Sequence, residues 1–151
     1  MRPSQTPQSG KIQLYTPEER VRRDATVWTL IQGLLAPIQF LVFVVSLVLV
    51  VRFLITGEGY AMAADSVVAK TALLYLIMIT GAVWEKIVFG QYLFAPAFFW
   101  EDVFSFAVIA LHTLYVNALD GTNWSPLTLM LIALAAYATY VSNAGQFILK
   151  L

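Results

Sequence analysis

The chain has 151 residues, of which 60% are hydrophobic and 12% charged, and its mean hydropathy is +0.75. Soluble domains are about 45–50% apolar and about 25% charged, so this composition indicates an integral membrane protein. The net charge of zero argues against binding to nucleic acid, and the absence of cysteine excludes disulfides, thiolate metal sites and a cysteine nucleophile. A single histidine, His112, excludes a histidine-rich zinc site and a bis-histidine haem within one chain.

The N-terminal residues predict a tail followed by a helix. Residues 1–15 are mostly polar and contain no apolar core of a signal peptide, so we expect a disordered tail without a cleavable signal. The sequence from Thr16 to Glu19 is a capping box with a proline at the first helical position, which predicts a helix that begins at Pro17. We expect this helix to follow the membrane surface and to continue into the first span, where Pro37 kinks it.

Four apolar runs predict an all-α integral membrane protein, with residues 16–151 forming one four-helix domain. The expected spans cover about residues 28–54, 66–89, 101–119 and 126–149. Glycines 57 and 59 predict the first turn, Asp65 or Ser66 the cap of the second span, and Ser125-Pro126 the start of the fourth.

The second uncharged run covers only residues 71–84, or about 21 Å, which is short for a membrane span. The helix must therefore include Lys70 at one end and Glu85 with Lys86 at the other. We expect Lys70 to extend toward the membrane surface and the shorter Glu85 to face protein rather than lipid.

Positive charges predict the orientation in a bacterial inner membrane. Seven basic residues fall on one side of the spans and two, Arg52 and Lys70, on the other. The positive-inside rule then places both termini and the segment between the second and third spans in the cytoplasm. The seven are Arg2, Lys11, Arg20, Arg22, Arg23, Lys86 and Lys150.

The segment from Trp84 to Asp102 departs most from an ordinary bundle. It combines three carboxylates, Glu85, Glu101 and Asp102, with Lys86 and seven aromatic residues, and Pro96 breaks it into a re-entrant or interfacial stretch. An ionised group at a helix centre costs about 2.5–3.5 kcal/mol, and less near the ends. The carboxylates therefore indicate a proton-transfer site beside a large flat apolar ligand, or else interfacial ion pairing with Lys86 and the arginines of residues 20–23.

Polar residues on one face of the third span lead away from this segment. Glu101, Ser105, Val108, His112 and Tyr115 are separated by steps of four, three, four and three. His112 is expected about 16 Å from Glu101 along the axis. Three roles stay open for its imidazole: a ligand to the magnesium of a chlorin, a hydrogen-bond donor, or a partner of a neighbouring tyrosine or asparagine.

The sequence resembles the 2-vinyl bacteriochlorophyllide hydratase family, also called chlorophyllide 3-vinyl hydratases. The resemblance runs from about Tyr15 to the C-terminus and is carried by Tyr15–Arg20, Gln32–Phe40, Trp84–Lys86, Phe89–Asp102 and Asn143–Phe147. It implies addition of water to the C3 vinyl group of chlorophyllide a during bacteriochlorophyll a synthesis. The substrate carries its own magnesium, so no further metal or redox cofactor is expected.

The resemblance, combined with the chemistry of the side chains, suggests a role for each candidate. Glu101 or Glu85 is expected to be the acid, and Asp102 or the other glutamate to orient water. Lys86 is expected to pair with the free propionate, and His112 to bind the substrate magnesium axially or to assist proton movement. The expected walls of the macrocycle site are Trp84, Tyr92, Phe98 and Trp100.

The main alternative is a non-catalytic carrier or assembly factor for (bacterio)chlorophyll(ide), which needs the aromatic residues and His112 but no cluster of carboxylates. A transporter or proton channel is disfavoured because no file of charged residues crosses the bundle, and a respiratory anchor subunit because there is one histidine. Besides the pigment and the lipid bilayer, the expected partners are a second copy of the chain or neighbouring enzymes of bacteriochlorophyll synthesis. Four short helices enclose little volume, so a dimer interface is an alternative location for the pocket.

Overall fold

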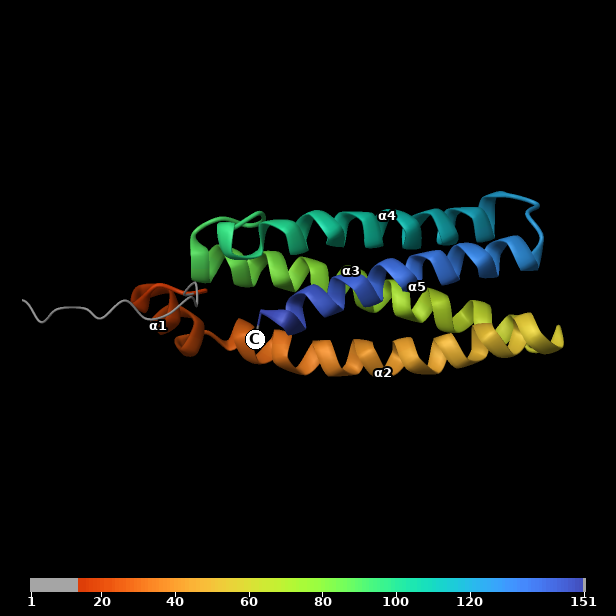
Figure 1. Ribbon diagram of the computed structural model, residues 1–151, viewed down its shortest axis with the longest axis horizontal. Helices are drawn as coiled ribbons and strands as arrows, with labels where there is room; N and C mark the ends of the chain where they lie inside the picture. Colours follow the sequence, from red (N-terminus) through yellow and green to blue (C-terminus); the bar gives the residue numbers. More distant parts are fainter. Residues whose placement is uncertain (1–13, 151) are drawn as a thin grey trace, which may run out of the picture.

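The computed structural model describes residues 14–150, and no strand occurs among them. Four long apolar helices run antiparallel and are long enough to cross a membrane, which confirms the predicted fold class. The short helix α1, the α3–α4 connection and the end of α5 lie together at one end of the bundle (Figure 1). The elements are α1 (Pro17–Ala25), α2 (Val27–Thr56), α3 (Tyr60–Phe89), the 3₁₀ helix η1 (Pro96–Phe98), α4 (Phe99–Gly121) and α5 (Pro126–Leu149).

Helix α1 has the predicted cap but does not continue into the first span. The Oγ1 atom of Thr16 accepts the Glu19 amide at 3.2 Å, and the Glu19 carboxylate accepts the Thr16 amide at 2.8 Å. The extended backbone of Thr26 ends α1, and its hydroxyl accepts the Trp28 amide at 3.3 Å as the cap of α2. The predicted continuous helix is thus two helices, because Thr26 caps the second one. Most of the predicted tail, residues 1–13, lies outside the described residues.

The turn between α2 and α3 is where the glycines predict it, with φ of 74° at Gly57 and 81° at Gly59. The predicted cap at Asp65 or Ser66 is wrong, because α3 already begins at Tyr60. Alanine favours helix, and an alanine-rich turn extends α3 upstream of Asp65. At the other predicted start, the Ser125 hydroxyl accepts the Thr128 amide at 3.2 Å and α5 begins at Pro126.

Inside the bundle, α2 packs mainly against α3 and α4 mainly against α5. The predicted buried face of α4 is confirmed from Glu101 through Tyr115. Glu85 is buried as predicted, but the expectation that Lys70 reaches toward the membrane surface is wrong, since its side chain is fully buried. The Lys70 ammonium lies 3.6 Å from the centroid of the Tyr140 ring, so an aromatic face inside the bundle takes the place of water around it.

Candidate active site

The three predicted carboxyl groups come together at the end of the bundle that holds α1. Glu85 lies near the end of α3, and Glu101 and Asp102 lie in the first turn of α4, so the α3–α4 connection brings them together. All three are buried. The side chains of Glu85 and Asp102 are within hydrogen-bonding contact of one another. Two ionised carboxylates in contact repel each other, so this pair is most stable when it shares one proton.

Glu101 has a different partner from the other two carboxyl groups. Its two carboxylate oxygens each lie 2.9 Å from the ammonium of Lys150, at the end of α5. The Lys150 ammonium also donates to the carbonyl of Ala97. Asn143 donates to the Glu101 carbonyl at 2.9 Å, so α5 holds this residue through both its side chain and its backbone. Glu101 is therefore an ion-pair partner, and the pair that can exchange a proton is Glu85 with Asp102.

Two consecutive backbone amides of the α3–α4 connection bind this pair. The Phe94 amide donates to Asp102 at 2.9 Å, and the Ala95 amide reaches Glu85 at 3.4 Å. Phe94 has a φ of 62°, which is unusual for a residue other than glycine and costs roughly 1–2 kcal/mol. The strain and the two amide bonds occur together, so the backbone conformation serves to aim both amides at the carboxyl groups.

The predicted aromatic walls divide into a buried and an exposed group. Trp84 and Phe98 pack edge-on at 5.9 Å between ring centroids, and both also contact Phe89. The Trp84 indole donates to the Thr29 hydroxyl at 2.9 Å. Tyr15 stacks on Phe89 at 5.6 Å and closes the cluster on the side of α1. This buried group fixes α1 and η1 over the end of α3.

Tyr92 and Trp100 form the exposed group and are 61% and 66% exposed. They lie near a stack of Phe94 on Phe106, whose centroids are 5.5 Å apart at an interplanar angle of 21°. The Lys86 ammonium lies 5.5 Å from the Tyr92 centroid and donates to the Gly90 carbonyl at 3.0 Å. We call Lys86, Tyr92, Phe94, Trp100 and Phe106 the aromatic face.

His112 is not part of this end of the bundle. Its side chain is fully buried, and its Nδ1 atom is 2.7 Å from the Val108 carbonyl. It follows Asp102 by about 15 Å along α4. This distance exceeds that from the central magnesium of a chlorin to the chlorin's own C3 vinyl carbon. The structure therefore does not bring His112 together with the carboxyl groups. Among residues 14–150, no group of three or more histidine, aspartate and glutamate side chains could hold a metal ion.

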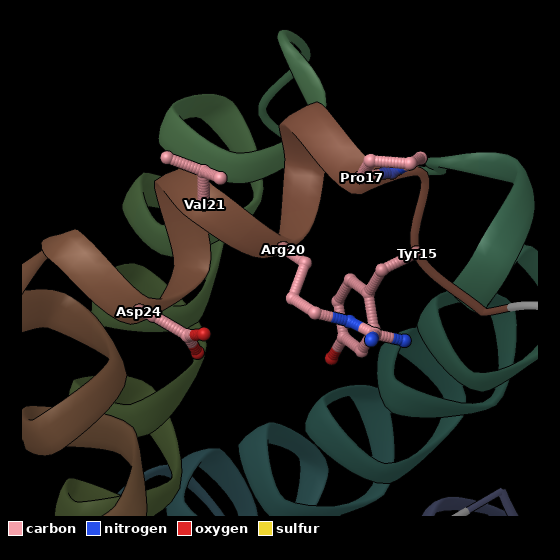
Figure 2. A pocket seen from close by; sticks show the side chains of 5 residues that line it. All are labelled: Tyr15, Pro17, Arg20, Val21 and Asp24. Atoms are coloured by element: carbon pink, nitrogen blue, oxygen red, sulfur yellow. The ribbon is translucent and has the colours of Figure 1, made fainter.

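Two shallow hollows lie on the described surface. One, of about 240 Å³, lies on α1 beside Tyr15, with Arg20 and Asp24 extending toward it (Figure 2). The other, of about 310 Å³, is apolar and lies between α2 and α3. Ligand pockets usually enclose about 300–1,000 Å³ and most of the ligand surface. Neither hollow encloses a large flat ligand, so such a ligand would lie against an outer face of the bundle.

Residues 15–151 match the family model described as 2-vinyl bacteriochlorophyllide hydratase. The chain belongs to this family. A protein named 2-vinyl bacteriochlorophyllide hydratase from Rhodobacter capsulatus is 72% identical over 138 residues, which cover 91% of this chain and 80% of the relative. One of the same name from Cereibacter sphaeroides is 66% identical over 146 residues, covering 97% of this chain and 91% of the relative. No solved structure matches the chain.

For this family member, two residues of the site were missed at the level of sequence. Lys150 was counted only as a basic residue of the cytoplasmic side, although it shares a helical face with Asn143 and could have been placed opposite the start of the third span. Phe94 gives no signal at all, because a left-handed backbone is usually marked by glycine or asparagine.

Proposed function

We propose that this chain adds water to the C3 vinyl group of chlorophyllide a and gives the 3-(1-hydroxyethyl) derivative in bacteriochlorophyll a biosynthesis. Its membership of the 2-vinyl bacteriochlorophyllide hydratase family supports this reaction. The observation that carries the mechanism is the contact between Glu85 and Asp102, because hydration of an alkene needs an acid and a base at one place.

In this mechanism Glu85 holds the proton and Asp102 is ionised. Asp102 lies in the first turn of α4, where the helix dipole favours negative charge, and it accepts the shorter amide hydrogen bond. Glu85 lies near the C-terminal end of α3, where the dipole disfavours negative charge, and its amide bond of 3.4 Å is long. The two carboxyl groups therefore have opposite preferences, as an acid and a base at one pH require.

The steps balance without any further reactant. Glu85 gives its proton to the terminal vinyl carbon, the alkene electron pair forms the new C–H bond, and the cation at the inner carbon is delocalised into the macrocycle. A water molecule attacks the inner carbon and gives a proton to Asp102. Because the two carboxyl groups touch, Asp102 returns this proton to Glu85. The net change is one added water with no oxidation or reduction, and the magnesium of the substrate stays in place.

The aromatic face is where we place the macrocycle. Phe94 belongs to this face and also donates its amide to Asp102, so a ring lying on the face approaches the carboxyl pair. Lys86 uses one donor for the Gly90 carbonyl and has others for the propionate of the substrate. Trp84 and Phe98 lie behind this face in the buried cluster and support it. His112 has no contact with the substrate in this arrangement.

The test is conversion of chlorophyllide a by membranes of a non-photosynthetic host that expresses the chain alone, with products weighed by mass spectrometry. The wild-type product should be heavier by one water. Glu85→Gln and Asp102→Asn keep the shape of the side chains and should each lower the rate by at least about 100-fold while the pigment still binds. Asp120→Asn, at the opposite end of α4, is the matched control and should convert at the wild-type rate.

Two results would oppose the proposal. Full activity of both amide variants would show that the carboxyl pair is not the acid and base. Pigment that binds to wild-type protein and leaves unaltered would instead favour the carrier.

The orientation is part of the same proposal: both termini and the aromatic face on the cytoplasmic side of the bacterial inner membrane. Lys86, Lys150 and the arginines of α1 all lie at the end that holds the carboxyl groups, whereas Arg52 lies at the other. Because the chain has no cysteine, single introduced cysteines at Glu58 and Gln91 would report the two sides by labelling with an impermeant reagent. A second copy of the chain or a neighbouring enzyme of the same synthesis is the partner we expect over the open face.

A further inference from the structure

A second polar group lies deep in the bundle, away from the carboxyl pair, and all four long helices contribute to it. Lys70 of α3, His112 of α4, Tyr137 of α5 and Ser46 of α2 are all buried. Each lies about ten residues, or about 15 Å, from the helix end at the side of the α2–α3 turn. They therefore share one level of the bundle.

Contacts between these side chains are direct but incomplete. The Tyr137 hydroxyl is hydrogen-bonded to Ser46, whose hydroxyl is 2.7 Å from that of Ser66. The Tyr137 ring lies between two basic side chains: its centroid is 5.7 Å from that of His112 and 6.0 Å from the Lys70 ammonium. Serine and tyrosine thus satisfy one another, whereas the two basic groups flank the ring without a bond to it.

Lys70 Nζ and His112 Nε2 have no hydrogen-bond partner among residues 14–150. A buried polar atom without a partner costs about 1–3 kcal/mol, and more when it is charged. The Tyr140 ring stabilises the charge of Lys70 but accepts no conventional hydrogen bond. His112 Nδ1 faces a carbonyl, which only accepts, so Nδ1 carries the hydrogen and Nε2 of the neutral ring offers a lone pair.

A donor and an acceptor at one level determine what can bind there. An anion would suit Lys70 but would face the lone pair of His112. A large ligand has no room where four helices pack. A water molecule accepts from one group and donates to the other, and buried waters commonly bridge such groups. We propose that Lys70 and His112 hold a bound water at mid-depth in the bundle. This site is independent of the proposed hydratase reaction.

The test is hydroxyl-radical labelling by X-ray radiolysis of the purified protein in lipid nanodiscs, because radicals form at bound water and modify adjacent side chains. Tyr137, only 2% exposed, should be oxidised in the wild type. Lys70→Met and His112→Phe should lower this oxidation several-fold, and Lys70→Gln, which can still donate, should retain it. Thr71→Val is the matched control, since Thr71 is buried beside Lys70 but its hydroxyl already donates to Val67.

Three results would overturn the proposal. Tyr137 without oxidation in the wild type would show a dry core. Equal oxidation in wild type and both Lys70 variants would show general penetration of the bundle. A change in the absorption of bound chlorophyllide on His112→Phe, without a change in Tyr137 oxidation, would assign His112 to the magnesium of the pigment.

Discussion

Replacing Lys150 by methionine should destabilise the protein because it leaves Glu101 without a counter-charge. The Glu101 side chain is 4% exposed and the Lys150 side chain 35%. The ammonium lies 2.9 Å from both carboxylate oxygens. After the substitution, the carboxylate stays buried and has to be protonated or solvated at the expense of local packing.

The magnitude of the effect follows from the partial exposure of the pair. Breaking a fully buried pair by removing one partner costs about 3–5 kcal/mol, whereas an exposed pair contributes about 0.2–1 kcal/mol. One partner here is buried and the other about one-third exposed, so we expect about 2 kcal/mol for Lys150→Met. For a chain of this size that corresponds to a fall in Tm of about 4–8 °C.

Thermal unfolding followed by tryptophan fluorescence in detergent measures this effect. Lys150→Arg keeps the charge and should retain most of the stability. The double variant Glu101→Gln with Lys150→Met removes both charges and should recover about 1 kcal/mol relative to Lys150→Met. An unchanged Tm for Lys150→Met, or strictly additive losses in the double variant, would refute the argument that the pair is coupled.

Two further substitutions test the connection between α3 and α4. Phe94→Gly should retain about 1 kcal/mol more unfolding free energy than Phe94→Ala, because both lose the ring but only glycine accepts a φ of 62° without strain; the reverse order in unfolding experiments would contradict the left-handed backbone. Lys86→Met should raise KM for chlorophyllide several-fold with little change in kcat, and Lys86→Arg should stay near wild type; a matching loss of kcat would contradict a role in binding the propionate.

The fold was largely predictable because membrane helices are marked by composition and by caps. The capping box at Thr16, the glycines at 57 and 59 and the serine before Pro126 each mark a boundary that the structure contains. The helix breaks at Thr26 because of one side-chain hydrogen bond, a local event that hydrophobicity does not reveal.

The candidate site was predictable only as a set of residue types. The sequence places Glu85 and Asp102 at neighbouring helix ends, so their proximity could be anticipated. It does not reveal that Glu101 points to Lys150 instead, because that choice depends on where α5 ends in space. The division of the aromatic residues into buried Phe98 and exposed Trp100 likewise depends on the path of the connection.

The position of Lys70 has a consequence for how the chain is made. Its aromatic contacts, Tyr137 and Tyr140, belong to α5, the last helix to leave the ribosome. Until α5 enters the membrane, Lys70 has no aromatic surface to lie against, and a lysine at the centre of a lone helix costs about 2.5–3.5 kcal/mol. A nascent chain that stops before α5 therefore exposes a charge to lipid. Burial of Lys70 distinguishes the finished bundle from its incomplete precursors, and it gives membrane quality control a physical basis for recognising them.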